Sequence, residues 1–119
     1  MTKSKKFRYA CDVEGFEDAW VEIDTATWGM YEILDIPYAG HIERVRKYLP
    51  LYATYWHVKG EDGATIPFPK SKEYDLTWEL AFKRLGPESR RLWVWFGDSV
   101  VAALNEVIMP PKSRDEASA

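Results

Sequence analysis

The sequence predicts an α+β fold, in which an N-terminal β-hairpin is followed by a small helical bundle of about four helices. Apolar and polar side chains alternate over residues 7–13 and 20–24, which is the period of half-buried strands. From residue 25 onward, apolar positions recur at intervals of three and four, the period of an amphipathic helix. The chain has 119 residues and no long linker, so we expect a single domain over residues 1–109 and a disordered polar tail over residues 110–119.

The hairpin is predicted from two short alternating segments. The first, FRYACDV over residues 7–13, places Phe7, Tyr9 and Cys11 on one side of a strand. A polar loop that contains glycine follows it, and WVEID over residues 20–24 is typical of a second strand. We therefore expect the two segments to pair through this loop.

A first helix is predicted directly after the hairpin. The side-chain oxygen of Asp24 or Thr25 can accept hydrogen bonds from the free N–H groups of a first helical turn. Met30 and Leu34 follow at helical spacing, and Pro37 ends the helix because the residue before a proline avoids the α region.

Residues 41–57 predict the next helical segment. Pro50 lies in its middle, where it removes a backbone hydrogen bond and clashes with the preceding turn. We expect either a kink at this point or two short helices, with Pro50 in the first turn of the second. The apolar face of the segment is formed by Ile42, Val45, Leu49, Tyr52 and Trp56.

The second half of the chain alternates between extended and helical signals. Prolines at alternate positions predict that residues 64–70 form an edge strand or an arm over the surface. Asp75 is the expected cap of the next helix, and Gly86 is its expected end. The last helix is predicted over residues 87–108.

Composition narrows the classes of partner and compartment. The net charge of −3 argues against nucleic acid and against an anionic membrane surface, because both require a concentrated basic patch. No apolar run approaches the roughly 20 residues of a membrane span. Cys11 is the only cysteine, which fits a reducing compartment. We expect a cytoplasmic protein that binds neither nucleic acid nor membrane.

No residue pattern in the chain predicts catalysis, a cofactor or a metal site. The known nucleophile, phosphate-loop, dinucleotide and zinc-protease motifs are absent from the sequence. Along a straight helix His41 and His57 would lie about 24 Å apart, too far for one metal ion. Cys11 fits a small core residue, and the acidic residues between 14 and 24 fit a solvated hairpin face. We expect a protein that is not an enzyme.

The segment LWVWFGDSVVAAL, residues 92–104, is apolar nearly all the way round a helix. One stripe, which includes Trp93 and Phe96, is predicted to be core. Trp95 lies about 200° from Trp93 and belongs to a second seam, which is covered either by the rest of this domain or by a partner or second copy. Because aromatic anchors are favoured at interfaces, the candidate partner contacts are Val94, Trp95 and Val101, with Tyr48 and Tyr55 as a second pair.

The organisation of the chain resembles the tail assembly chaperones of long-tailed bacteriophages. AWVEID leads directly into TATWGMYEIL, several small helices follow, and the chain ends in a charged tail interrupted by prolines. The likeness in sequence covers residues 20–34. The resemblance implies a small α+β domain without catalytic activity, which coats the apolar helical tape-measure protein during tail assembly and recruits the tail-tube subunit.

The resemblance also implies that a longer form is made by ribosomal frameshifting. Codons for Pro110, Pro111 and Lys112 are able to form a slippery run. Two other functions remain open at this point. One is a structural connector or tail-completion protein that self-associates into a ring, and the other is a small acidic inhibitor that binds one enzyme.

Overall fold

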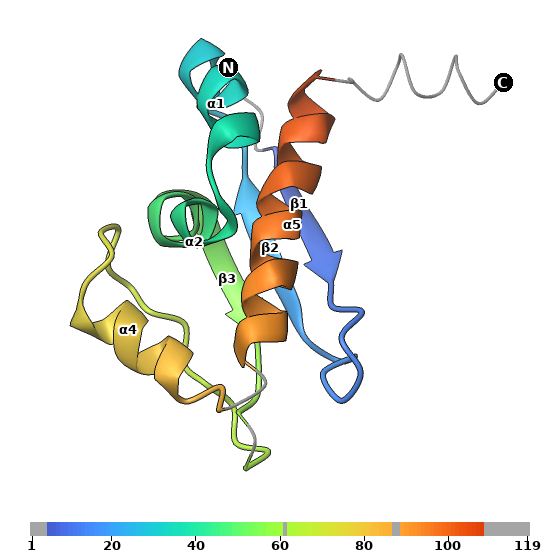
Figure 1. The fold of residues 1–119 in the computed structure, drawn as a ribbon, viewed down its shortest axis with the longest axis vertical. Helices are drawn as coiled ribbons and strands as arrows, with labels where there is room; N and C mark the ends of the chain where they lie inside the picture. The colour runs from blue at the N-terminus through green and yellow to red at the C-terminus, as the bar shows by residue number, and fades with distance from the viewer. Residues whose placement is uncertain (1–4, 61, 87–88, 109–119) are drawn as a thin grey trace, which may run out of the picture.

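The computed structural model describes residues 5–60, 62–86 and 89–108 (Figure 1). Helices and a three-stranded antiparallel sheet form one mixed α+β unit, as the sequence predicted. The long helix α5, Ser89–Ile108, runs across one face of the sheet. The expected tail over residues 110–119 lies outside the described residues, and Pro110, Pro111 and Lys112 lie there with it.

The predicted hairpin is confirmed and carries a third strand. Strand β1, Lys6–Ala10, pairs with β2, Trp20–Asp24, and β2 pairs with β3, Ala53–His57. The strand order is β1-β2-β3, so β2 is central. Val21 and Ile23 of β2 are buried, whereas their neighbours in the strand are less so. One face of the sheet therefore meets the core and the other faces solvent.

The prediction that helix continues to residue 57 is wrong. Helix α3, Leu49–Tyr52, ends before β3 begins at Ala53. Thr, Tyr and Trp in this strand favour a pleated, half-buried surface. Trp56 packs into the core opposite Val21, and the preceding Tyr55 points to the opposite, exposed face. Pairing with β2 thus outweighs the helical spacing of the apolar residues.

The helical segment before β3 consists of short pieces, which agrees with the second predicted alternative, two short helices, rather than with one kinked helix. It consists of α2, His41–Glu43, a wider π-helical turn η2, Arg44–Tyr48, and α3. Pro50 lies in the first turn of α3, directly after the π-helical turn, at a position where proline is tolerated.

The first helix begins later than predicted. Helix α1 spans Met30–Asp35 and is capped at Gly29. The Asp24 carboxylate accepts the Ala26 N–H at 2.9 Å and so holds a turn instead of a helix end. The expectation that Asp24 or Thr25 caps the helix is therefore corrected. A short 3-10 turn, η1, Ile36–Tyr38, continues α1.

The later elements follow the sequence closely. Helix α4 spans Leu76–Lys83, and the Asp75 carboxylate accepts hydrogen bonds from the N–H groups of Thr77 and Trp78 at 2.9 and 3.3 Å. Gly86 has a φ of 81°, the left-handed conformation that glycine adopts at helix ends.

Trp56 lies at the centre of the core. Its ring stacks on Phe96 of α5 at 5.6 Å and meets Trp78 and Phe82 of α4 edge-on at 5.5 and 5.9 Å. Its indole N–H donates to the Ile66 carbonyl at 2.9 Å. One side chain therefore joins the sheet, both later helices and the extended segment between them.

Candidate protein-binding surface

The aromatic cluster at the start of α5 belongs to the core. Trp95 is only 5% exposed, and its indole N–H donates to the Ala10 carbonyl at 3.1 Å. Phe96 packs against it with ring centroids 4.7 Å apart. The burial of Trp95 therefore contradicts the expectation that it contacts a partner, because the rest of the domain covers its side chain.

The other predicted partner contacts do not form one surface. Tyr48 is buried, and its hydroxyl donates to the Asp35 carboxylate. The structure therefore contradicts the expectation that Tyr48 contacts a partner, as it does for Trp95. Val94 and Tyr55 are exposed, and Val101 is half-buried. Val94 and Val101 lie on α5, whereas Tyr55 lies on the opposite, solvent-facing side of the sheet.

The first helix presents apolar side chains to solvent. Met30 is 65% exposed, Leu34 is 60% exposed and Tyr38 in η1 is 90% exposed. These residues recur at intervals of four along a backbone that stays helical through Ile36, so they form one stripe. We name the exposed residues Met30, Tyr31, Leu34 and Tyr38 the α1 face.

Two carboxylates of α1 bond to the rest of the protein. Glu32 is only 8% exposed. It accepts the Gly29 N–H and the Tyr52 hydroxyl, each at 2.8 Å. Asp35 accepts the Tyr48 hydroxyl and forms an ion pair with Lys47 at 3.2 Å. Helix α1 is thus anchored by these polar groups together with Ile33, which packs against the core.

The hydrogen bonds determine the charge state of these anchors. Burial alone would raise the pKa of Glu32, but the bonds from Gly29 and Tyr52 outweigh it and hold the pKa below its usual range. Burial, together with the hydrogen bond to Glu32, raises the pKa of Tyr52 to about 12. At neutral pH, a neutral hydroxyl therefore donates to a charged carboxylate.

Helix α1 is accordingly unusual in two respects, because the charged Glu32 is buried beside the core-packing Ile33, whereas the apolar Met30 and Leu34 are exposed. A surface helix normally buries its apolar stripe and exposes its polar side. Contiguous apolar patches on a soluble protein mark sites of interaction. Met30 and Leu34 fit the predicted helical spacing, but spacing alone does not indicate which side of a helix meets the core. The bond from the Tyr52 hydroxyl to Glu32 would have been the deciding signal, and Tyr52 lies on a helix that is distant in the sequence.

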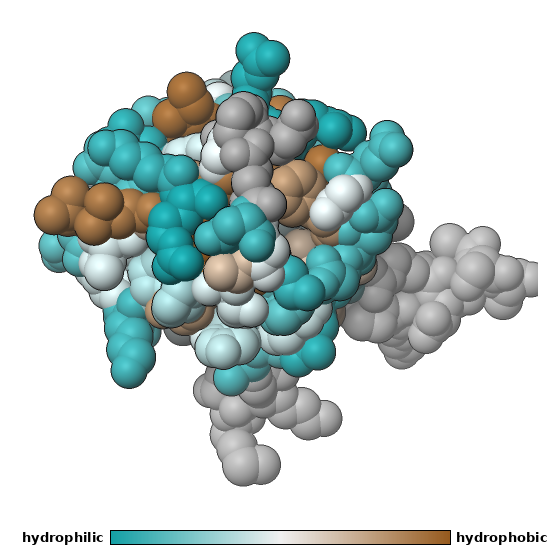
Figure 2. Space-filling view, turned by 90° about the horizontal axis from the view of Figure 1, so that it is seen from below, coloured by the Kyte–Doolittle hydropathy of each residue, from teal (hydrophilic) through white to brown (hydrophobic). Residues whose placement is uncertain are grey.

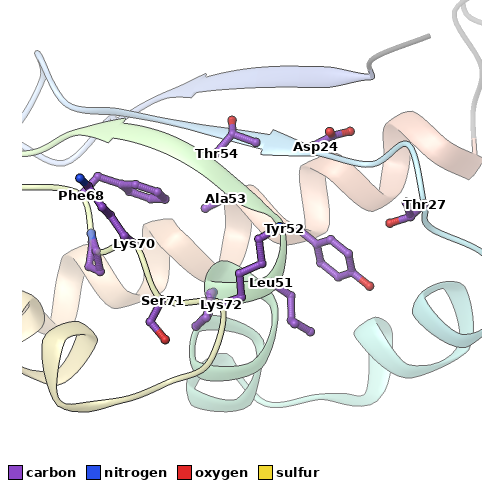
Figure 3. Close-up of a pocket in the computed structure, with 12 residues that line it drawn as sticks. Asp24, Thr27, Leu51, Tyr52, Ala53, Thr54, Phe68, Lys70, Ser71 and Lys72 are labelled. Carbon is purple, nitrogen blue, oxygen red and sulfur yellow. The ribbon is translucent and has the colours of Figure 1, made fainter. Parts of the chain in front are cut away.

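A pocket of about 390 Å³ lies beside β3 (Figure 3). Leu51, Tyr52, Ala53 and Thr54 line one side, with the segment from Phe68 to Lys72 along another. The hydroxyls of Tyr52, Thr54 and Ser71 donate to Glu32, to Glu22 and to the Glu73 carbonyl. These three hydroxyls are therefore engaged in hydrogen bonds within the fold.

The two histidines lie in separate places. His41 meets Asp98 at 3.5 Å, and His57 meets Asp18 at 3.8 Å. Within residues 5–60, 62–86 and 89–108, no group of three or more histidine, cysteine or acidic side chains is placed to hold a metal ion. Helices long and apolar enough to cross a membrane are likewise not found in those ranges.

Comparison of the chain with protein-family models, with curated proteins and with solved structures gives no match.

Proposed function

We propose that this protein is a non-enzymatic tail assembly chaperone of a long-tailed bacteriophage, which acts in the host cytoplasm. In this proposal the α1 face binds apolar helices of the tape-measure protein until assembly displaces it. The observation that carries the proposal is the exposure of Met30 and Leu34 on α1, while the carboxylate of Glu32 on the same helix is buried. Recruitment of the tail-tube subunit belongs to the same proposal.

The size of the α1 face suits reversible binding. Burial of apolar surface contributes roughly 25 cal/mol per Å², and a stable complex buries about 800 Å² on each partner. Four side chains on a short helix supply only part of that area. Many copies along one long client would still bind together through multivalency, and each copy could be displaced singly.

The rigid anchoring of α1 supports recognition of a helix. The carboxylates of Glu32 and Asp35 fasten α1 to Tyr52 and Lys47. The Arg44 guanidinium donates to the Ile36 and Pro37 carbonyls at 2.9 and 3.2 Å. A preorganised apolar stripe avoids the entropy cost of ordering on binding. A client helix can pack its own apolar stripe against it.

The acidic inhibitor receives less support from the hairpin. Asp18 pairs with Lys59 at 3.1 Å, and Glu22 lies 3.6 Å from Arg8. These carboxylates already have cationic neighbours in the fold, which weakens the field that would steer a basic enzyme.

Co-expression with the tape-measure protein of the same phage genome tests the proposal. The readout is the fraction of the tape-measure protein that stays soluble and co-purifies with this chain. We expect the variant Met30→Ser/Leu34→Ser/Tyr38→Ser to lose most of that fraction, and Leu76→Ser on α4 to keep it. The proposal fails if the wild-type chain leaves the client insoluble, or if it forms stable rings that exclude the client.

A further inference from the structure

A second exposed apolar surface lies far from α1. The extended segment 66–71 runs beside α4, and a groove of about 500 Å³ opens between them. In Figure 1, α4 and α1 lie toward opposite ends of the long axis of the molecule. Figure 2 shows apolar side chains at the surface on the side where α4 lies. We name this feature the α4 groove.

The α4 groove has an apolar lining and few hydrogen-bonding groups. Leu80 is 49% exposed and lines the groove with Ala81, Ile66 and Phe68. Pro67 and Pro69 complete the wall, and neither offers a backbone N–H. An added strand needs such donors at alternate positions, so the groove suits the side chains of a helix rather than an extended peptide.

Cationic side chains lie at both ends of the groove. Lys70 precedes Ser71, whose carbonyl accepts the Trp78 indole N–H at 2.9 Å near the start of α4. Arg84 follows the last residue of α4. Along α4, the groove runs from Thr77 to Arg84, a rise of about 10 Å or two helical turns.

Neither cation has a carboxylate of its own in the part of the chain that the structure describes. The ion pairs within residues 5–60, 62–86 and 89–108 include neither Lys70 nor Arg84. On α4 itself, Glu79 pairs instead with Lys83 at 3.7 Å. The ends of the groove therefore present positive charge to an incoming partner.

We propose that the α4 groove binds an amphipathic helix of a partner protein, whose apolar stripe is flanked by Asp or Glu residues about two turns apart. The apolar residues of the partner pack on Leu80 and Phe68, and its carboxylates meet Lys70 and Arg84. This inference is independent of the α1 face and of the proposed chaperone function.

Two matched peptides test the inference. Both are helical, about four turns long, and share one leucine stripe, but one carries Glu and the other Lys beside that stripe. Fluorescence anisotropy of each labelled peptide gives its affinity for the full chain. We expect the Glu peptide to bind roughly tenfold more tightly than the Lys peptide, with a preference that weakens as salt is raised.

Variants separate the groove from other surfaces. The double variant Lys70→Glu/Arg84→Glu should reverse the preference between the two peptides, and Leu80→Ser should weaken both. Leu34→Ser on the α1 face is the matched control and should change neither affinity. Circular dichroism verifies that each variant is folded, and all of these side chains are exposed enough to be replaced without loss of core.

Three results would overturn the inference. The first is equal affinity for the two peptides. The second is a preference that survives the charge reversal. The third is self-association of the free chain that disappears in Leu80→Ser, which would mean that a second copy fills the groove. A wild-type chain that leaves the tape-measure protein insoluble would, by contrast, overturn the proposed function and leave the groove untouched, so the two proposals fail separately.

Discussion

The Tyr52 hydroxyl donates to the Glu32 carboxylate at 2.8 Å and so ties α3 to the inner side of α1. This bond, together with the burial of Glu32, leaves Met30 and Leu34 on the outer side of the helix. The position of the α1 face therefore depends on this polar contact as well as on the apolar packing of Ile33 and Ile36 against the core.

Tyr52→Phe is expected to lower the free energy of unfolding by about 1–2 kcal/mol, because a buried carboxylate loses a hydrogen-bond donor. Urea unfolding followed by circular dichroism measures the change. Tyr38→Phe is the matched control, since its side chain is exposed and no bond in the described structure involves its hydroxyl. Equal losses in the two variants would mean that the bond to Glu32 contributes nothing.

Acid should destabilise the protein through Glu32. Its pKa in the folded state lies below that of an unfolded glutamate, about 4.3. The unfolded state therefore binds the proton more readily, and the stabilisation present above about pH 4.3 is lost as pH falls through the folded value. Glu32→Gln should flatten this dependence.

Urea unfolding at a series of pH values between neutral and acid measures that slope. Tyr52→Phe should also reduce it, because the variant lacks a bond that stabilises the charged carboxylate. An unchanged slope in both variants would assign acid sensitivity to other groups, such as Asp35, whose pKa is lowered by its bonds to Tyr48 and Lys47.

Gly97 on α5 allows the close approach of α2. A Cβ atom at this position would lie 2.9 Å from Cδ2 of His41. Gly97→Ala should therefore give no net stabilisation in the wild type, although alanine is favoured in a helix by about 1 kcal/mol. In a His41→Ala background the same change should stabilise by about that amount. A thermodynamic cycle measures the coupling, and additive effects would contradict the contact.

Trp95→Phe tests the assignment of this residue to the core. We expect it to cost about 2 kcal/mol, through the lost bond to Ala10 and the smaller ring. Val94→Ala, at an exposed position of the same helix, should change stability by no more than about 0.5 kcal/mol. If Trp95→Phe left stability unchanged but abolished client binding, the original expectation of a partner contact would be restored.

The sequence predicts the elements whose signals are local. The strand at residues 20–24, the cap at Asp75 and the end at Gly86 all depend on neighbouring residues, and the structure has each of them. The α+β class follows from the same signals. Local chemistry is sufficient where the partner groups lie within a few positions of one another.

The features that the sequence does not predict depend on distant contacts. Strand β3 forms because Tyr55 and Trp56 pair with residues of β2, although the apolar residues before and within the strand have helical spacing. The orientation of α1 depends on Tyr52, twenty residues after Glu32. Trp95 is buried because its indole meets the Ala10 carbonyl, 85 residues away. The candidate binding surface therefore lies on α1 and not, as the sequence predicted, on α5.

Site-specific photo-cross-linking locates the client most directly. A photoreactive phenylalanine analogue replaces Leu34 in one variant and Val94 in another, and each is co-expressed with the tape-measure protein of the same phage genome. We predict a cross-link to that protein from position 34 and none from position 94. A cross-link from position 94 alone would place the client on α5 and contradict the assignment of the α1 face as the binding surface.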